Sequence, residues 1–148
     1  MYISVSTIAL IVFVTFMVDV SRSAARARIA QELHQNAQFV MDRLGQEVRS
    51  SKVIITTEPP SKFNADVGSL ALTTSSGTHT FALSSNVVTL DAAPLTSPSV
   101  LVTMLKFTNA SPAVTVQLHV EENNLSIPEA SRQSIDLQTT LVPRQAVY

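Results

Sequence analysis

The sequence predicts an α+β protein in which one long N-terminal helix packs on a small antiparallel β-sheet. Two observations support this prediction. Residues 1–52 keep a helical rhythm and contain no proline. Residues 53–148 consist of short segments in which apolar and polar side chains alternate, as they do in half-buried strands. Because no second helix is available to connect parallel strands, the strands are expected to run antiparallel.

The helix is expected to have two unlike halves. Residues 1–20 form a hydrophobic half, because Ile3–Val18 is almost wholly apolar and Asp19 ends the run. Residues 21–52 form an amphipathic half. At about 1.5 Å per residue the whole helix would be roughly 75 Å long, which exceeds the width of a small domain. Its two halves therefore need two different environments.

The hydrophobic half is short for a solitary transmembrane helix, which needs about 20 apolar residues. Its Ser and Thr side chains can bond back to the carbonyl four residues earlier and favour close packing between helices. A cleaved signal peptide is not indicated, because no basic residue precedes the run. One interpretation is a simple membrane anchor, and the other is a helix that leaves the membrane to pack against copies of itself. The second assigns these contacts to Ile3, Ile8, Leu10, Ile11, Phe13, Phe16, Asp19 and Arg22.

Charged residues follow the apolar run at once. Asp19 either lies at the membrane edge or pairs with Arg22, three positions later, or with an arginine of another copy. Arg22, Arg26 and Arg28 are alternatively expected to rest on anionic lipid headgroups. The alanines between these arginines should keep the junction helical.

The amphipathic half has one apolar stripe whose residues recur every three or four positions, which is the period of a helix face. Polar and charged residues occupy most of the remaining circumference. The stripe is expected to dock on the sheet and consists of Ile29, Leu33, Ala37, Val40, Leu44 and Val48.

The sheet domain is expected over residues 53–148. The helix should end near Ser50–Lys52, where β-branched residues begin. Val100–Phe107 is apolar on both faces and is therefore predicted to be a central strand. Val114–Glu121 shows the cleanest alternation, and Asp91–Pro98 is expected to be a loop. The other predicted strands are Leu70–Thr74 and Thr78–Leu83, which form a hairpin, and Asn86–Leu90 and Ser134–Val142.

Composition and motifs argue against an enzyme, a cofactor site and a specific nucleic-acid interface. The net charge is −1 and the ten Lys and Arg residues are spread along the chain, so no basic patch is indicated. Cysteine and tryptophan are absent, which leaves no thiolate chemistry and few stacking platforms. Three glycines cannot build a phosphate-binding loop, and no Gly-x-Ser-x-Gly elbow occurs. His34, His79 and His119 are far apart and are expected to be solvated.

One polar segment contains candidate oxygen ligands for calcium. Glu121, Glu122 and Asn124 lie close together within the polar loop expected over Glu121–Arg132. Their spacing matches no calcium motif, and adjacent carboxylates in a strand point to opposite faces. We therefore predict no metal site.

The first third of the chain resembles a known family. Tyr2–Ser6, running into Ile8–Val12, resembles the membrane helix of type IV pilins and the related type II secretion pseudopilins. Arg26–Leu33, with Met41–Leu44 and Glu47–Arg49 after it, is similar to the following helix of minor pilins and minor pseudopilins. Farther on, Leu95-Thr96-Ser97 and the strand after it resemble the C-terminal sheet of the minor group. The resemblance is closer over Met1–Val53 than over the rest of the chain.

The start of the chain departs from the family pattern. Processed family members usually begin with Phe, have Glu at the fifth position and follow a short basic leader that ends in Gly, whereas here Met1 and Val5 stand at those positions. Either the sequence begins about seven residues inside the mature protein, which would bring the apolar run to the required length, or this subunit lacks the Glu. We expect the first, because Tyr2-Ile3-Ser4 resembles the stretch after the usual Glu. The leader also matters for topology, because in the family its basic residues hold the N-terminus in the cytoplasm. Without a leader, the arginines after the apolar run would favour a cytoplasmic position for the domain that follows them.

The resemblance implies a structural subunit of a type IV pilus or a type II secretion pseudopilus. Such a subunit crosses the inner membrane once before assembly and joins an extracytoplasmic, cell-surface filament through its N-terminal helix. Its partners would be other pilin or pseudopilin subunits, inner-membrane lipid and the assembly machinery. The alternative is a membrane-anchored extracytoplasmic binding module, such as an adhesin or sensor ectodomain, that never polymerises.

Overall fold

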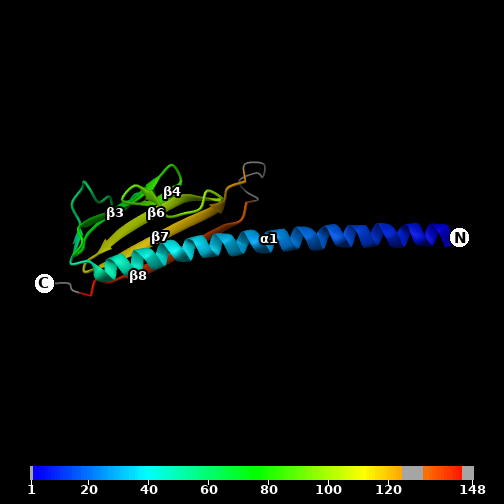
Figure 1. The fold of residues 1–148 in the computed structure, drawn as a ribbon, viewed down its shortest axis with the longest axis horizontal. Coiled ribbons are helices and arrows are strands. Elements are labelled where there is room, and N and C mark those ends of the chain that lie inside the picture. The colour runs from blue at the N-terminus through cyan, green and yellow to red at the C-terminus, as the bar shows by residue number, and fades with distance from the viewer. Residues whose placement is uncertain (1, 125–131, 145–148) are drawn as a thin grey trace. The chain divides into compact units, whose positions relative to one another are not determined.

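The computed structural model describes residues 2–124 and 132–144, with side chains described from residue 10 onward. The chain divides into two compact units, Met1–Glu32 and Leu33–Tyr148, and each is described by itself. Helix α1 (Tyr2–Ser50) contributes to both units, and the strands of the second unit follow it along the chain (Figure 1). One helix combined with antiparallel sheets makes this an α+β fold, as predicted.

The first unit is the N-terminal part of α1. It contains no proline or glycine, and its alanines have the highest helix propensity of all residues. The Thr15 hydroxyl donates to the Ile11 carbonyl oxygen at 2.8 Å, which is the back-bond expected for a threonine in an apolar helix. The backbone is therefore helical through the junction between the apolar and polar segments.

The last turns of α1 belong to the second unit and end at Ser50, within the predicted range. The Ser51 hydroxyl and amide both donate to the Val48 carbonyl oxygen, at 2.7 and 3.3 Å, and so satisfy one of the carbonyl groups left free at a helix end. The next amide, that of Lys52, donates to Thr73 at 2.8 Å and leads the chain into the first strand.

The first sheet has five antiparallel strands in the order of the sequence. Two of its strands form the predicted hairpin, and their residues are paired from Ser69↔Ala82 to Thr73↔Thr78. The strands are β1 (Val53–Ile55), β2 (Ser69–Thr73), β3 (Thr78–Ser84), β4 (Val87–Leu90) and β5 (Ala93–Pro94).

Two tight turns connect the last three strands of this sheet. Ser85 and Asn86 have φ angles of 50° and 63°, and Asp91 and Ala92 have φ angles of 52° and 68°. Two central residues with positive φ are typical of the turns that match the twist of a hairpin. The second turn leads into β5, which lies inside the segment that the sequence predicts to be a loop. The sequence does not indicate this strand, because it is only two residues long and the segment contains two prolines.

The second sheet has three antiparallel strands, β6 (Val100–Ala110), β7 (Ala113–Glu122) and β8 (Ser134–Leu141), in the order β6-β7-β8. Two predictions are therefore wrong. The strands form two sheets rather than one, and the central strand is β7, whereas the strand that contains Val100–Phe107 lies at the sheet edge.

Loop backbone covers this outer edge of β6. The Leu105 amide donates to Asp66 and the Leu105 carbonyl accepts from Gly68, both at 2.8 Å. The Asn64 amide donates to Phe107 at 2.8 Å, and the Val102 amide donates to Asn86 at 2.9 Å. These bonds, rather than a further strand of the same sheet, pair backbone groups of Val102, Leu105 and Phe107 along this edge of β6.

The core of the second unit lies between the stripe of α1 and the inner faces of the strands. The alternation predicted for β7 is confirmed, because every second side chain from Val114 to Val120 is buried. A Cβ added to Gly45 would lie 3.7 Å from the Leu141 side chain, so the helix passes close to the end of β8. The Ser97 amide donates to the Asn36 side-chain oxygen at 3.0 Å and connects the helix to the loop before β6.

Candidate functional site

The apolar surface of the first unit is the most unusual feature of the chain. Nine large apolar side chains are exposed there, from 43% for Val18 to 64% for Phe16. Leu10–Val14 are five consecutive apolar residues, and at about 100° per residue they pass right round the helix. A helix that is apolar all round is normally buried in a large core or in a membrane. The nine residues are Leu10, Ile11, Val12, Phe13, Val14, Phe16, Met17, Val18 and Val20.

One side of this surface is hollowed. A shallow depression of about 290 Å³ lies among Phe13, Phe16, Met17 and Val20, with Ser21 at its polar end. Exposed apolar surfaces of this kind mark contacts with another protein or with a membrane. In the part of the chain that the structure describes, no helix has a stretch long and apolar enough to span a membrane.

The structure gives these positions for the residues that the sequence assigns to the hydrophobic half. Leu10, Ile11, Phe13 and Phe16 are exposed on the helix, as are Asp19 and Arg22. Ile3 and Ile8 lie in the helical backbone, but their side chains are outside the described residues. No ion pair joins Asp19 to Arg22 among the described residues.

The apolar stripe of the amphipathic half lies mostly in the second unit. Its five members there have at most 1% of their surface exposed, so they form one wall of the core. Ile29, the first residue of the predicted stripe, belongs to the first unit. The five buried residues are Leu33, Ala37, Val40, Leu44 and Val48.

The calcium candidates are occupied by protein contacts. Glu121 and Glu122 lie at the end of β7, and the two side chains differ in burial, as expected for adjacent strand residues. Glu122 is buried, and the Asn124 side-chain amide donates to it at 3.4 Å. Among the described residues no group of three or more His, Asp or Glu side chains is arranged to hold a metal ion. The middle of the polar loop predicted over Glu121–Arg132 lies outside the described residues.

A charged cluster that the sequence does not reveal surrounds His119. Its Nδ1 lies 2.5 Å from an Asp136 carboxylate oxygen, and its Nε2 lies 3.1 Å from a Glu121 carboxylate oxygen. The hydrogen bond to Asp136 raises the pKa of His119, burial opposes this effect, and the bond to Glu121 adds to it. Arg132 Nη1 lies 4.0 Å from the second Glu121 oxygen. His119 is therefore partly solvated, with 22% of its side chain exposed, and also bound to two carboxylates.

His79 forms a second pair of this kind and is also partly solvated, with 26% of its side chain exposed. His79 Nδ1 lies 2.6 Å from Asp91 Oδ2, and the Thr80 amide donates to the other oxygen of the same carboxylate at 2.8 Å. The hydrogen bond from His79, followed by that from Thr80, lowers the pKa of Asp91. Both bonds hold the Asp91 turn against β3. No sequence signal pairs His79 with Asp91, because the contact depends on how β3 and β4 align.

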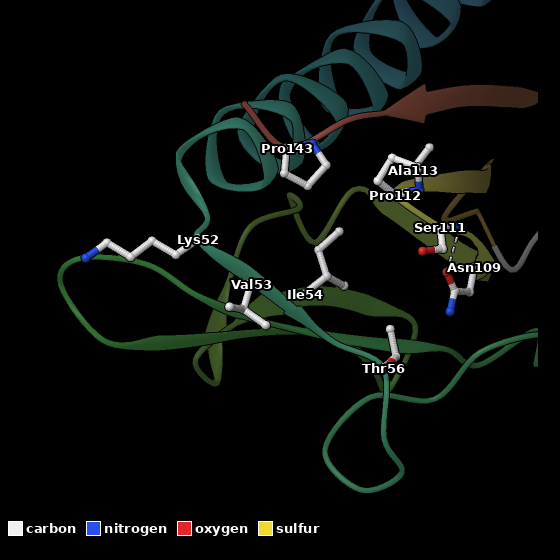
Figure 2. Close-up of a pocket in the computed structure, with 9 residues that line it drawn as sticks. All are labelled: Lys52, Val53, Ile54, Thr56, Asn109, Ser111, Pro112, Ala113 and Pro143. Atoms are coloured by element: carbon white, nitrogen blue, oxygen red, sulfur yellow. Dashed lines mark hydrogen bonds between the residues drawn. The ribbon is translucent and has the colours of Figure 1, made fainter. Parts of the chain in front are cut away.

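The second unit also has a pocket of about 180 Å³ at the end of α1 (Figure 2). Its walls come from β1, the turn between β6 and β7, and Pro143 after β8. Asn109 accepts a hydrogen bond from the Ser111 amide at 3.0 Å, which fixes the turn. Among the described residues that line the pocket, Lys52 is the only charged one, so the lining suggests no acid–base or metal chemistry.

Comparisons with models of known protein families, with curated proteins and with solved structures find no match. The proposal of a function therefore depends on the surfaces of this chain and on its sequence.

Proposed function

We propose that this chain is a structural subunit of an extracytoplasmic filament and polymerises through the apolar half of α1. The observation that supports this function best is the exposed surface of residues 10–20, which is apolar around the whole circumference of the helix. Burying one large apolar side chain contributes about 1.5–3 kcal/mol. Nine such side chains favour transfer out of water strongly, either into lipid or among other helices.

The two apolar environments would be used in sequence. Before assembly the helix lies in the inner membrane, and on assembly it packs among the helices of other subunits. Lipid and a bundle of apolar helices are similarly apolar, so transfer between them costs little and packing decides the outcome. A head-to-tail contact that does not close into a ring then yields a filament.

Within this class we propose a minor pilin or minor pseudopilin, of a type IV pilus or a type II secretion pseudopilus. Support comes from the resemblance of Met1–Val53 to that group and from the α+β fold of the second unit. The buried stripe explains how one helix can serve two purposes. Its C-terminal part completes the core of the second unit, which would form the outer surface of the filament.

The test replaces Leu10 or Ile11 with Asp. A charge at the centre of an apolar helix costs about 2.5–3.5 kcal/mol on insertion into a membrane. We therefore expect each variant to be depleted at least about tenfold from sheared surface filaments and from the membrane fraction. The matched control is Gln31→Asp, which introduces the same charge at an exposed polar position of the same unit.

Normal incorporation of Leu10→Asp into filaments would exclude this function. A membrane-anchored binding module makes a different prediction. The unmodified chain would then stay in the membrane fraction, and crosslinking through residues 10–20 would never join two copies.

A further inference from the structure

Three arginines follow the apolar surface directly. Arg22, Arg26 and Arg28 are exposed, and Arg22 lies two residues after Val20, where the apolar surface ends. At about 100° per residue, Arg22 and Arg26 lie roughly 40° apart, and Arg28 lies about 120° from Arg22 on the other side. The three side chains therefore span an arc of about 160°, a little less than half of the helix circumference. We call these three residues the arginine collar.

The collar has the depth of a lipid headgroup layer. Six residues separate Arg22 from Arg28, which corresponds to about 9 Å along the helix. The headgroup region on one side of a bilayer is of similar thickness, roughly 5–8 Å. If Val20 lies at the boundary of the hydrocarbon, all three guanidinium groups can reach phosphate groups, because long arginine side chains bend toward the interface.

Charge complementarity favours an anionic surface over another copy of the chain. Asp19 is the only acidic residue between positions 10 and 28, so a second copy would offer one carboxylate in this region for three arginines. A guanidinium group also matches the geometry of phosphate oxygens, to which it can donate two parallel hydrogen bonds.

We propose that the arginine collar binds the phosphate groups of anionic phospholipids and makes the first unit prefer negatively charged membranes. This inference depends on the membrane-bound stage of the proposed function. It develops the sequence-based expectation that these arginines rest on anionic headgroups into a preference of the subunit for anionic over neutral lipids. Each arginine near an anionic surface is expected to strengthen binding about fivefold.

The test measures how the full-length chain partitions into two kinds of vesicle. One consists of phosphatidylcholine alone, and the other contains phosphatidylglycerol in addition. We expect the unmodified chain to prefer the anionic vesicles by about 100-fold at low ionic strength, and we expect added salt to reduce this preference. The variant Arg22→Gln/Arg26→Gln/Arg28→Gln should bind both vesicles equally. Gln keeps a high helix propensity, so the helix itself is retained.

The matched control is Arg49→Gln, which removes an exposed arginine from the last turn of α1 in the second unit. Its preference for anionic vesicles should not change. Equal binding of the unmodified chain to both vesicles would overturn the collar proposal and leave the filament function intact. Binding to neither vesicle would contradict the membrane stage of the proposed function as well.

A further outcome would identify a protein partner instead of lipid. If the triple variant keeps the anionic preference but is lost from filaments, the arginines pair with another subunit, and the lipid proposal is wrong.

Discussion

At the scale of single residues, His119 connects two strands through its contacts with carboxylates. Its two ring nitrogens lie 2.5 Å from Asp136 of β8 and 3.1 Å from Glu121 of β7. Both contacts are hydrogen bonds to carboxylates only when both nitrogens carry protons, that is, when the ring is an imidazolium. The other charged group of this cluster is Arg132, which lies 4.0 Å from Glu121. The bridge should therefore respond to pH.

The pKa of His119 is raised in the folded protein, chiefly by the hydrogen bond to Asp136. A histidine whose pKa is higher in the folded than in the unfolded protein stabilises the fold when it is protonated. This contribution is fully present at pH values below the unfolded pKa of about 6.5, and it is lost as the pH rises through the folded pKa. We expect His119→Gln to lower the free energy of unfolding by about 0.5–1 kcal/mol near pH 6 and by less near pH 9. Chemical denaturation at both values measures this difference. An equal loss at both pH values would contradict the bridge.

Gly68 is required by a close approach of two backbone segments. A Cβ at this position would lie 2.7 Å from the Leu105 carbonyl oxygen and 3.2 Å from the Lys62 carbonyl oxygen. Backbone atoms cannot move aside as the end of a flexible side chain can. Gly68→Ala should therefore destabilise the protein by about 1–3 kcal/mol.

Gly45→Ala is the control for this substitution. The nearest atom to its new Cβ would be Leu141 Cδ2 at 3.7 Å, an ordinary contact. Alanine also has a helix propensity about 1 kcal/mol better than glycine. Thermal unfolding should therefore show a loss for Gly68→Ala and no loss for Gly45→Ala.

At the scale of elements, the helix stripe is the part of the core most open to a direct test. Leu33 is 1% exposed and begins the buried stripe of the second unit. Leu33→Asp would bury a carboxylate without a partner, which costs about 3 kcal/mol or more. We expect limited proteolysis to cleave the strand region rapidly in this variant. Gln35→Asp, at an exposed position two residues later, should keep the original digestion pattern.

The sequence predicts elements well where one periodicity dominates. The alternation of β7 and the end of α1 follow from local patterns, and both agree with the structure. The position of β6 could not be predicted in this way. Apolar residues on both faces do not distinguish a central strand from an edge strand whose backbone bonds to a loop, as the backbone of β6 bonds to the loop before β2.

The charged clusters were beyond sequence analysis for a related reason. His119 and Asp136 become partners only because β7 and β8 align in one register, His119↔Asp136, across a connection of more than ten residues. A shift by one residue would place Asp136 on the opposite face. Pairing across strands is set by the whole sheet and not by the spacing of the residues along the chain.

At the scale of the whole molecule, the boundary between the two units falls within α1, between Glu32 and Leu33. The nine exposed apolar residues of positions 10–20 belong to the first unit, and the buried core belongs to the second. The function of the apolar half and the stability of the core should therefore be separable by mutation.

This separation can be measured on the variant used to test the filament function. Leu10 is 63% exposed and is not part of the core, so Leu10→Asp should change the free energy of unfolding of the second unit by less than about 0.5 kcal/mol. Denaturant unfolding followed by circular dichroism in detergent provides this measurement. A large loss of stability would mean that missing filaments reflect misfolding rather than a lost contact.

The loop that bonds to the outer edge of β6 affects how closely neighbouring domains can be packed without aggregating. Subunits of a filament hold their outer domains at very high local concentration, where any open strand edge can recruit a neighbouring chain and begin aggregation. The amide and carbonyl of Leu105 already bond to Asp66 and Gly68, so this part of the edge has no free groups to offer a neighbour. The close approach that only glycine permits at position 68 would thus help such domains to stand side by side without fusing into a common sheet.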